Sequence, residues 1–130
     1  MNKKVLIVED DKLLCDVYRH SLELEGIGVL TAESYNSAIK IFNPDNISLL
    51  VLDIMLKNKN GFELLRDLRK RPNGDTVPTI IVTGMNTQDL NMDKELMVSL
   101  NILGIYTKSQ FSISQFSKVV KDLIGQSEAV

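Results

Sequence analysis

The sequence predicts an α/β fold in which a doubly wound, five-stranded parallel sheet lies between two layers of helices. Short apolar runs rich in β-branched residues recur along the chain, and the segments between them carry apolar residues at helical spacing. The strongest runs are apolar at nearly every position, as expected of strands buried on both faces. They lie at 5–8, 49–52 and 79–82, and weaker ones lie at 28–32 and 104–107.

Each helical segment follows a strand, which implies βαβ units, right-handed crossovers and therefore a parallel sheet. Three of these segments begin directly after a residue type that caps helices well. The candidate N-caps are Asp11, Ser34 and Ser112. Another helix is expected after Gly61. The periodicity is weaker between residues 85 and 100, where a helix is expected to begin near Asp89 or Asp93.

Length and composition place the chain among ordinary globular domains. With 130 residues, it is expected to form one domain over residues 1–125, followed by a short flexible tail at 126–130. A net charge of −2 gives no reason to expect direct binding of nucleic acid. The single cysteine, Cys15, fits a reducing cytoplasm, and no run approaches the roughly 20 apolar residues of a membrane span. A cytoplasmic domain without membrane contact is therefore expected.

Acidic residues follow two of the predicted central strands. Glu9 and Asp10 come after the first strand, and Asp53 follows the third. The carboxyl ends of parallel strands meet at one edge of a sheet, where such folds bind their ligands. Carboxylates brought together there repel one another unless a cation neutralises them, and oxygen ligands suit Mg²⁺. Asp53 could then attack phosphorus and form an aspartyl phosphate.

The fourth and fifth predicted strands end in groups that complement this chemistry. Thr83 supplies a hydroxyl donor and Lys108 a mobile ammonium. Both could contact phosphoryl oxygens whose charge a metal only partly neutralises. Asp11 is interpreted as a helix cap rather than a ligand. An acidic pair, an aspartate, a threonine and a lysine therefore follow one another along the chain, each at the end of its own strand. Together they form a specific signal.

Several segments carry a resemblance to a known family. They are VLIVEDD at 5–11, LDIM at 52–55, NGFELL at 60–65, IVTG at 81–84 and YTK at 106–108. Over about residues 4–124 the chain resembles the receiver domains of two-component response regulators. This resemblance implies a flavodoxin-like three-layer sandwich with strand order 2-1-3-4-5. It also implies that Asp53 is the phosphoacceptor, and that Asp10, Asp53 and the backbone carbonyl of Met55 ligate Mg²⁺. Glu9 would act on the metal mainly through water.

The resemblance also implies partners and a mode of action. Thr83 and Lys108 would bind the phosphoryl group and couple its arrival to a shift in the face formed by the fourth helix, fifth strand and fifth helix. The phosphate would come from a sensor histidine kinase or a histidine phosphotransfer protein. The output would be a downstream protein or an output domain of a longer regulator, and the same face could serve a dimer. Such a domain is a switch and not an enzyme, apart from its own phosphorylation and slow dephosphorylation.

The sequence departs from the family pattern at three positions. Lys57 and Ser109 stand where the family usually has proline, and Ile105 stands where it usually has the switching aromatic. Tyr106 is adjacent, but neighbouring residues of a strand face opposite sides. These departures keep open an alternative, a receiver-like module that binds partners without phosphorylation. A phosphatase using an aspartyl phosphate is disfavoured, because Met55 occupies the place of its second acid.

Two further expectations concern side chains near these positions. In the family that the chain resembles, the residues two positions beyond the phosphoacceptor and the threonine influence how easily water reaches the phosphoryl group. Here they are Met55 and Met85, whose thioethers can shield that group but cannot orient an attacking water. Slow self-dephosphorylation is therefore expected. Lys57, Lys59 and residues 66–71 form a basic stretch that is interpreted as a solvated surface.

Overall fold

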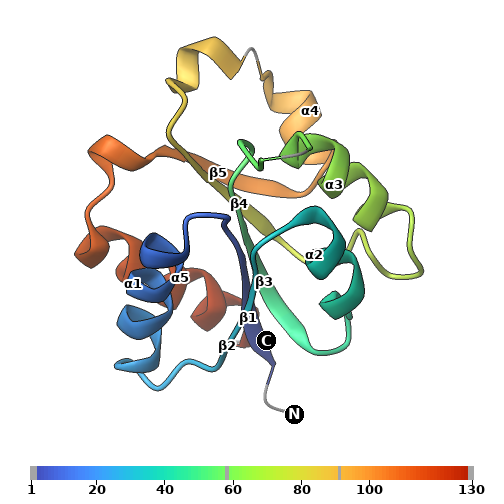
Figure 1. The fold of residues 1–130 in the computed structure, drawn as a ribbon. Helices are drawn as coiled ribbons and strands as arrows, with labels where there is room; N and C mark the ends of the chain where they lie inside the picture. The colour runs from blue at the N-terminus through green and yellow to red at the C-terminus, as the bar shows by residue number, and fades with distance from the viewer. Residues whose placement is uncertain (1–2, 58, 91, 129–130) are drawn as a thin grey trace.

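The computed structural model describes residues 3–57, 59–90 and 92–128, and it confirms the expected α/β fold (Figure 1). The five parallel strands have the order β2-β1-β3-β4-β5. The strands are β1 (Lys4–Val8), β2 (Val29–Ala32), β3 (Ile47–Leu52), β4 (Thr79–Thr83) and β5 (Ile102–Thr107). The helices are α1 (Lys12–Glu23), α2 (Tyr35–Ile41), α3 (Gly61–Arg69), α4 (Lys94–Ser99) and α5 (Ile113–Glu128), with single 3₁₀ turns η1 (Thr87–Leu90) and η2 (Lys108–Gln110).

Helices cover both faces of the sheet, as a doubly wound topology requires. Figure 1 shows α1 and α5 on one side, and α2, α3 and α4 on the other. Alternate residues of the central strands feed two separate apolar cores. Leu6 and Leu50 belong to the core beneath α2, α3 and α4, whereas Val5 and Leu49 belong to the core beneath α1 and α5. This alternation explains why the central strands are apolar at most positions.

The helix starts follow from the expected caps. The side chain of Asp11 accepts a hydrogen bond from the backbone N–H of Leu14, which confirms its structural role. Ser34 forms a reciprocal capping box with Ser37. Ser112 Oγ accepts from Gln115 N at 3.1 Å, and the Gln115 side chain accepts from Ser112 N in return. These bonds satisfy backbone donors that the first helical turn leaves free.

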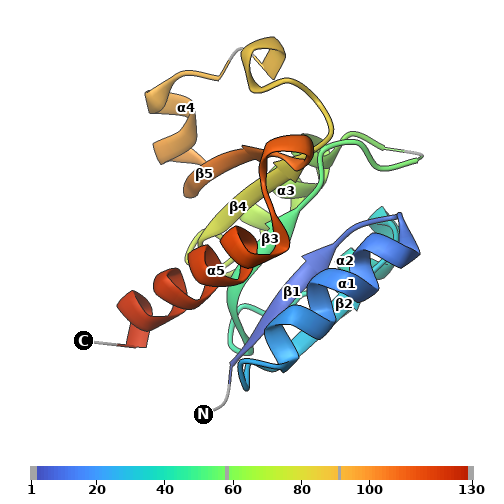
Figure 2. The same ribbon diagram turned by 90° about the vertical axis from the view of Figure 1, so that its left-hand side faces the viewer.

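The segment between β4 and β5 is the least regular part of the fold. Of the two expected helix starts, Asp93 is the N-cap of α4, whereas Asp89 lies in η1. α4 has six residues, none of them buried. Figure 2 shows α4 and the yellow turn η1 above β5, the edge strand of the sheet.

Two further findings concern the ends of the chain and the membrane. α5 continues to Glu128, past the expected domain boundary at residue 125, and residues 129–130 of the expected tail lie outside the described part of the chain. The boundary itself stays a prediction. Within the described residues, no helix combines the length and the apolar character needed to cross a bilayer.

Arg69 corrects the interpretation of the basic stretch as a solvated surface. Its guanidinium is half-buried and donates to three acceptors: Leu100 O at 2.9 Å, Gly74 O at 2.7 Å and Thr79 Oγ1 at 2.7 Å. Burial lowers the pKa of Arg69 to about 10. Arg69 therefore fastens the end of α3 to the start of β4 and to the end of α4. Periodicity could not reveal this role, because all three acceptors lie outside its own helix.

Candidate functional site

Strand register places two acidic residues side by side. Val8, the last residue of β1, pairs with Leu52, the last residue of β3. The next residues are Glu9 and Asp53, and Asp53 N donates to Val8 O at 3.1 Å, extending the pairing by one step. Glu9 and Asp53 are 2% and 4% exposed. The two carboxylates therefore extend from the ends of neighbouring strands, and both are buried.

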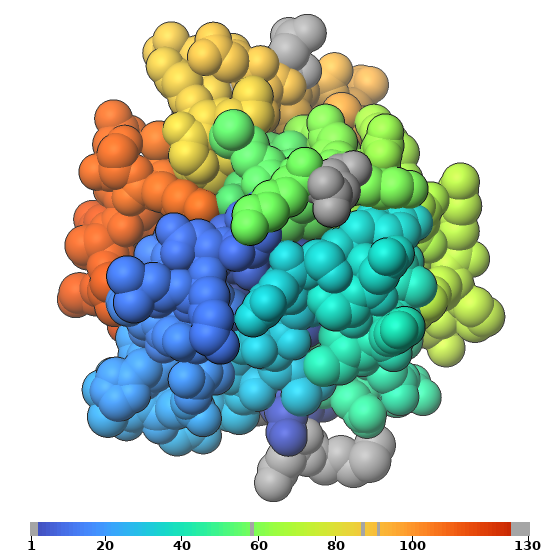
Figure 3. All heavy atoms as spheres, viewed as in Figure 1, coloured from blue at the N-terminus to red at the C-terminus, as the bar shows by residue number. Residues whose placement is uncertain are grey.

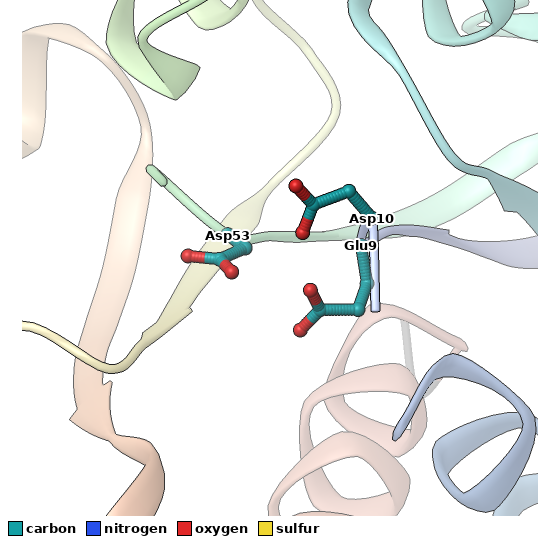
Figure 4. A group of neighbouring side chains, drawn as sticks. All are labelled: Glu9, Asp10 and Asp53. Carbon is teal, nitrogen blue, oxygen red and sulfur yellow. The ribbon is translucent and has the colours of Figure 1, made fainter. Parts of the chain in front are cut away.

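Asp10 completes a group of three carboxylates. One oxygen from each of Glu9, Asp10 and Asp53 lies within 4.8 Å of the other two. Figure 4 shows the carboxylates of Glu9 and Asp10 directed toward Asp53. Asp10 is only half-buried, so the group opens to solvent on its side. The arrangement brings together the three acids that the sequence singled out.

Lys108 reaches this group from the other side of β3. Thr83 at the end of β4 pairs with Thr107 at the end of β5, and Lys108 follows directly. Its Nζ lies 2.6 Å from Glu9 Oε1 and 2.8 Å from Asp53 Oδ2. One ammonium thus bridges two buried carboxylates, which still leaves the group with a surplus of negative charge.

The electrostatics of the site follow from burial and from this bridge. Burial raises the pKa of Glu9 to about 7; Lys108 and the N–H of Asp11 lower it in part, whereas the charge of Asp53 raises it further. Burial also disfavours the Lys108 ammonium, but its bonds to Asp53 and Glu9 prevail and raise its pKa to about 12. The lysine therefore stays charged, and Glu9 takes up a proton more readily than an ordinary glutamate.

Met55 contacts the acidic group, and Thr83 ends the neighbouring strand β4. Thr83 is fully buried, and its Oγ1 accepts from Met85 N at 3.2 Å. No hydrogen bond among the described residues uses its O–H as a donor. Met55 N donates to Asp53 Oδ1 at 3.0 Å, and Met55 bridges Asn60 across the β3–α3 loop. The loop backbone thus holds the carboxylate of Asp53.

Comparison with known proteins identifies the family. The protein-family model of the response regulator receiver domain matches residues 5–120 of the sequence. The chain belongs to the response regulator receiver family. The alkaline phosphatase synthesis transcriptional regulatory protein PhoP of Bacillus subtilis (strain 168) is 31% identical over 128 residues, which are 98% of this chain and 51% of that protein. The chain therefore spans about half the length of this curated relative.

Solved receiver structures have the same fold. The Francisella response regulator 1452 receiver domain has a TM-score of 0.77 and 26% identity, covering 98% of this chain and 100% of that one. Response regulator TrrA of Thermotoga maritima, solved in complex with Mg²⁺–BeF, has a TM-score of 0.74 and 24% identity, covering 93% and 98%. As a receiver domain, the chain is a signalling module rather than an enzyme.

Ile105, at the position where the family usually has an aromatic residue, and the adjacent Tyr106 face opposite sides of the sheet. Ile105 packs into the core beneath α2, α3 and α4, whereas Tyr106 packs into the opposite core. There the Tyr106 ring stacks on Phe111, with centroids 4.2 Å apart and planes 10° from parallel. Phe111 in turn meets Phe116 of α5 edge to face. Tyr106 is thus tied to α5 and does not replace an aromatic at position 105.

Two features of the receiver site were not deduced from the sequence. The first is the contact of Lys108 with Glu9, because the sequence indicated only a phosphoryl group as the partner of this lysine. The second is the close approach of α3: a Cβ on Gly61 would lie 2.6 Å from Asp53 O. Gly61 N also donates to Ile54 O at 2.7 Å. The Asn-Gly pair at 60–61 was a signal for this contact, because glycine allows backbone to pack on backbone.

The raised pKa of Glu9 predicts a pH dependence of stability in the metal-free protein. Between its ordinary value of 4.5 and about 7, the unfolded chain has lost the Glu9 proton while the folded chain retains it. The free energy of unfolding is therefore expected to fall as pH rises through this window, and this contribution levels off above it. Urea unfolding at several pH values, with a chelator present, measures the slope.

Glu9→Gln is the matched variant for this measurement. It is expected to have a flatter profile than wild type between pH 4.5 and about 7, because its side chain does not titrate. Glu33→Gln, at an exposed position, is the control and should keep the wild-type slope. Identical slopes in wild type and Glu9→Gln would contradict the assignment.

Proposed function

We propose that the chain is a phosphorylation-dependent receiver that accepts a phosphoryl group on Asp53 with the help of Mg²⁺. The observation that carries this proposal is the group of Glu9, Asp10 and Asp53, with Lys108 in contact with two of its three carboxylates. The carboxylates of this group outnumber the one ammonium in contact with them, and a divalent cation would balance the excess negative charge.

The donor set fits Mg²⁺. Carboxylate oxygens from three residues lie close enough together to serve one ion, and Asp10 opens the site to the water that Mg²⁺ retains. Asp10, Asp53 and the backbone carbonyl of Met55 would ligate the ion, with Glu9 acting mainly through water. When bound, Mg²⁺ supplies charge neutralisation for the incoming phosphoryl group. The complex of the relative TrrA with Mg²⁺–BeF supports this assignment.

Phosphoryl transfer would proceed by attack of an Asp53 oxygen on phosphorus. The new O–P bond forms as the bond from phosphorus to the leaving group breaks, and the leaving group departs with the electron pair. Lys108, already 2.8 Å from Asp53, would exchange part of its contact with the carboxylate for a phosphoryl oxygen. Thr83 would donate its O–H to another phosphoryl oxygen.

Membership in the family implies a histidine kinase as partner. The phosphoryl group would come from a phosphohistidine of a sensor kinase or a phosphotransfer protein in the cytoplasm. The output would be a downstream protein or a further domain of a longer regulator; the PhoP relative is about twice as long as this chain. A dimer through α4, β5 and α5 also remains a prediction. Direct binding of nucleic acid by this domain is not expected.

Incubation with Mg²⁺ and acetyl phosphate tests the proposal. Intact-mass spectrometry is expected to show one added phosphoryl group, which does not form when Mg²⁺ is chelated before the donor is added. Beryllofluoride should perturb the NMR signals of residues near Asp53 and Thr83. Absence of both responses would overturn the proposal and favour the alternative of a module that binds partners without phosphorylation.

Slow self-dephosphorylation is a further expected property. Met55 is 55% exposed and Met85 is half-buried, and neither thioether can orient an attacking water. Met55→Asn supplies groups that can, so phosphate release should be several-fold faster than in wild type. Met55→Leu is the apolar control and should keep the slow rate. Phosphate release from the purified phosphorylated proteins measures both; equal rates in Asn and Leu variants would contradict the role of Met55.

A further inference from the structure

A polar groove adjoins the acidic group on the side of Asp10. It has a volume of about 460 Å³, and its wall includes Asp10, Thr31 and Glu33 from the ends of β1 and β2, together with Lys57 from the β3–α3 loop. The space-filling view in Figure 3 shows this face, where the green β3–α3 loop meets the blue start of α1 and the cyan α2 segment. The groove is therefore a solvent-exposed approach to the site through its most open carboxylate.

Among the described residues, Lys57 has neither an ionic nor an aromatic partner, unlike Lys108 and Lys59. Lys108 contacts both Glu9 and Asp53, and Lys59 lies over the ring of Tyr35, 4.3 Å from its centroid. Among the described residues, no ion pair or hydrogen bond engages the Lys57 ammonium, and the side chain is exposed. Its charge is therefore available to molecules that enter the groove.

We propose that Lys57 is a specificity residue that attracts anionic phosphoryl donors to the mouth of the site and opposes the binding of Mg²⁺ there. This inference rests on the proposed function. It assigns a role to a position at which the chain departs from its family, which usually has an uncharged proline there. The juxtaposition of Lys57 and Asp10 on one groove carries it.

Coulomb's law gives the two effects opposite signs. A dianionic donor approaching the groove is attracted by the ammonium, whereas a divalent cation approaching Asp10 is repelled by it. For a doubly charged ion about 8 Å away in water, the interaction changes a rate or an affinity roughly threefold at low ionic strength. The effect should fade above about 0.15 M salt, where the screening length becomes shorter than this separation.

The test compares Lys57→Met, Lys57→Arg and the control Lys59→Met, which removes the same charge from the same loop. The first measurement is the rate of Asp53 phosphorylation by acetyl phosphate at saturating Mg²⁺, over a range of salt concentrations. In this step acetate leaves with the electron pair of the broken O–P bond. Lys57→Met is expected to react about threefold more slowly at low salt, whereas Lys57→Arg and Lys59→Met should match wild type.

The second measurement is the Kd of Mg²⁺, obtained by NMR titration without a donor. Lys57→Met is expected to bind Mg²⁺ about threefold more tightly than wild type at low salt, and Lys59→Met should be unchanged. A structural defect would weaken both properties, so opposite changes identify an electrostatic role. Equal behaviour of Lys57→Met and Lys59→Met would overturn this inference alone. A wild-type protein that is never phosphorylated would overturn the proposed function, and this inference with it.

Discussion

Asp53→Asn is expected to reduce phosphorylation by acetyl phosphate to below detection. The amide lacks the nucleophilic carboxylate oxygen, and no other carboxylate of the group has the same surroundings: Asp53 accepts from both Met55 N and Lys108 Nζ. Binding of Mg²⁺ should also weaken, roughly tenfold or more, because one of three clustered negative charges is lost. Intact-mass spectrometry and a Mg²⁺ titration measure the two losses.

Folding should survive this substitution. Asparagine keeps the size of the side chain and an acceptor for Lys108, while the repulsion between Asp53 and Glu9 disappears. We therefore expect the variant to be at least as stable as wild type in urea. Asp45→Asn, an exposed change beyond the opposite end of the sheet, is the control and should be phosphorylated normally. Phosphate uptake by Asp53→Asn at the wild-type rate would place the acceptor elsewhere.

Arg69→Met is expected to lower the free energy of unfolding by about 3 kcal/mol. The side chain keeps much of its apolar length, but the substitution removes three hydrogen bonds and deprives Leu100 O, Gly74 O and Thr79 Oγ1 of their donor. Thr79 is fully buried, so water cannot readily replace the lost partner. Urea unfolding monitored by circular dichroism measures the change.

Arg66→Met provides the comparison, since Arg66 is exposed on the same helix. Its effect should stay within about 0.5 kcal/mol, as for most surface changes. Both variants remove one positive charge, so a difference in their free energies of unfolding measures the contribution of the hydrogen bonds of Arg69. A loss of less than about 1 kcal/mol in Arg69→Met would show that those contacts contribute little.

Sequence patterns predicted the features that depend on neighbouring residues along the chain. The apolar runs located the strands, and residues such as Asp11 and Ser34 located the helix starts, because capping acts over three residues. The meeting of Glu9 with Asp53 was also predictable, since parallel strands bring their carboxyl ends to one edge.

Features that depend on distant parts of the chain were harder to predict. The partners of Arg69 lie on three separate segments, and only the folded structure brings them together. The same holds for Lys108, whose bond to Glu9 joins residues at opposite ends of the sequence. The start of α4 was ambiguous because its helix lacks a buried face, so the apolar periodicity that marks other helices is weak there.

That weakly packed segment has a thermodynamic consequence. Between Thr83 and Leu100, none of the described side chains is fully buried, and the apolar side chains there are at most partly buried against one core, so the segment can rearrange at a lower cost than the strands. Free energies of local opening range from near zero to the global value, and such a segment lies at the low end. If a phosphoryl group accepts a hydrogen bond from Thr83, as proposed, that bond would contribute about 1.5–3 kcal/mol, enough to change the populations of two arrangements tenfold to a hundredfold. Arg69 holds the other end of the segment by donating to Leu100 O. A rearrangement that starts at Thr83 would therefore be limited to the residues between Thr83 and Leu100.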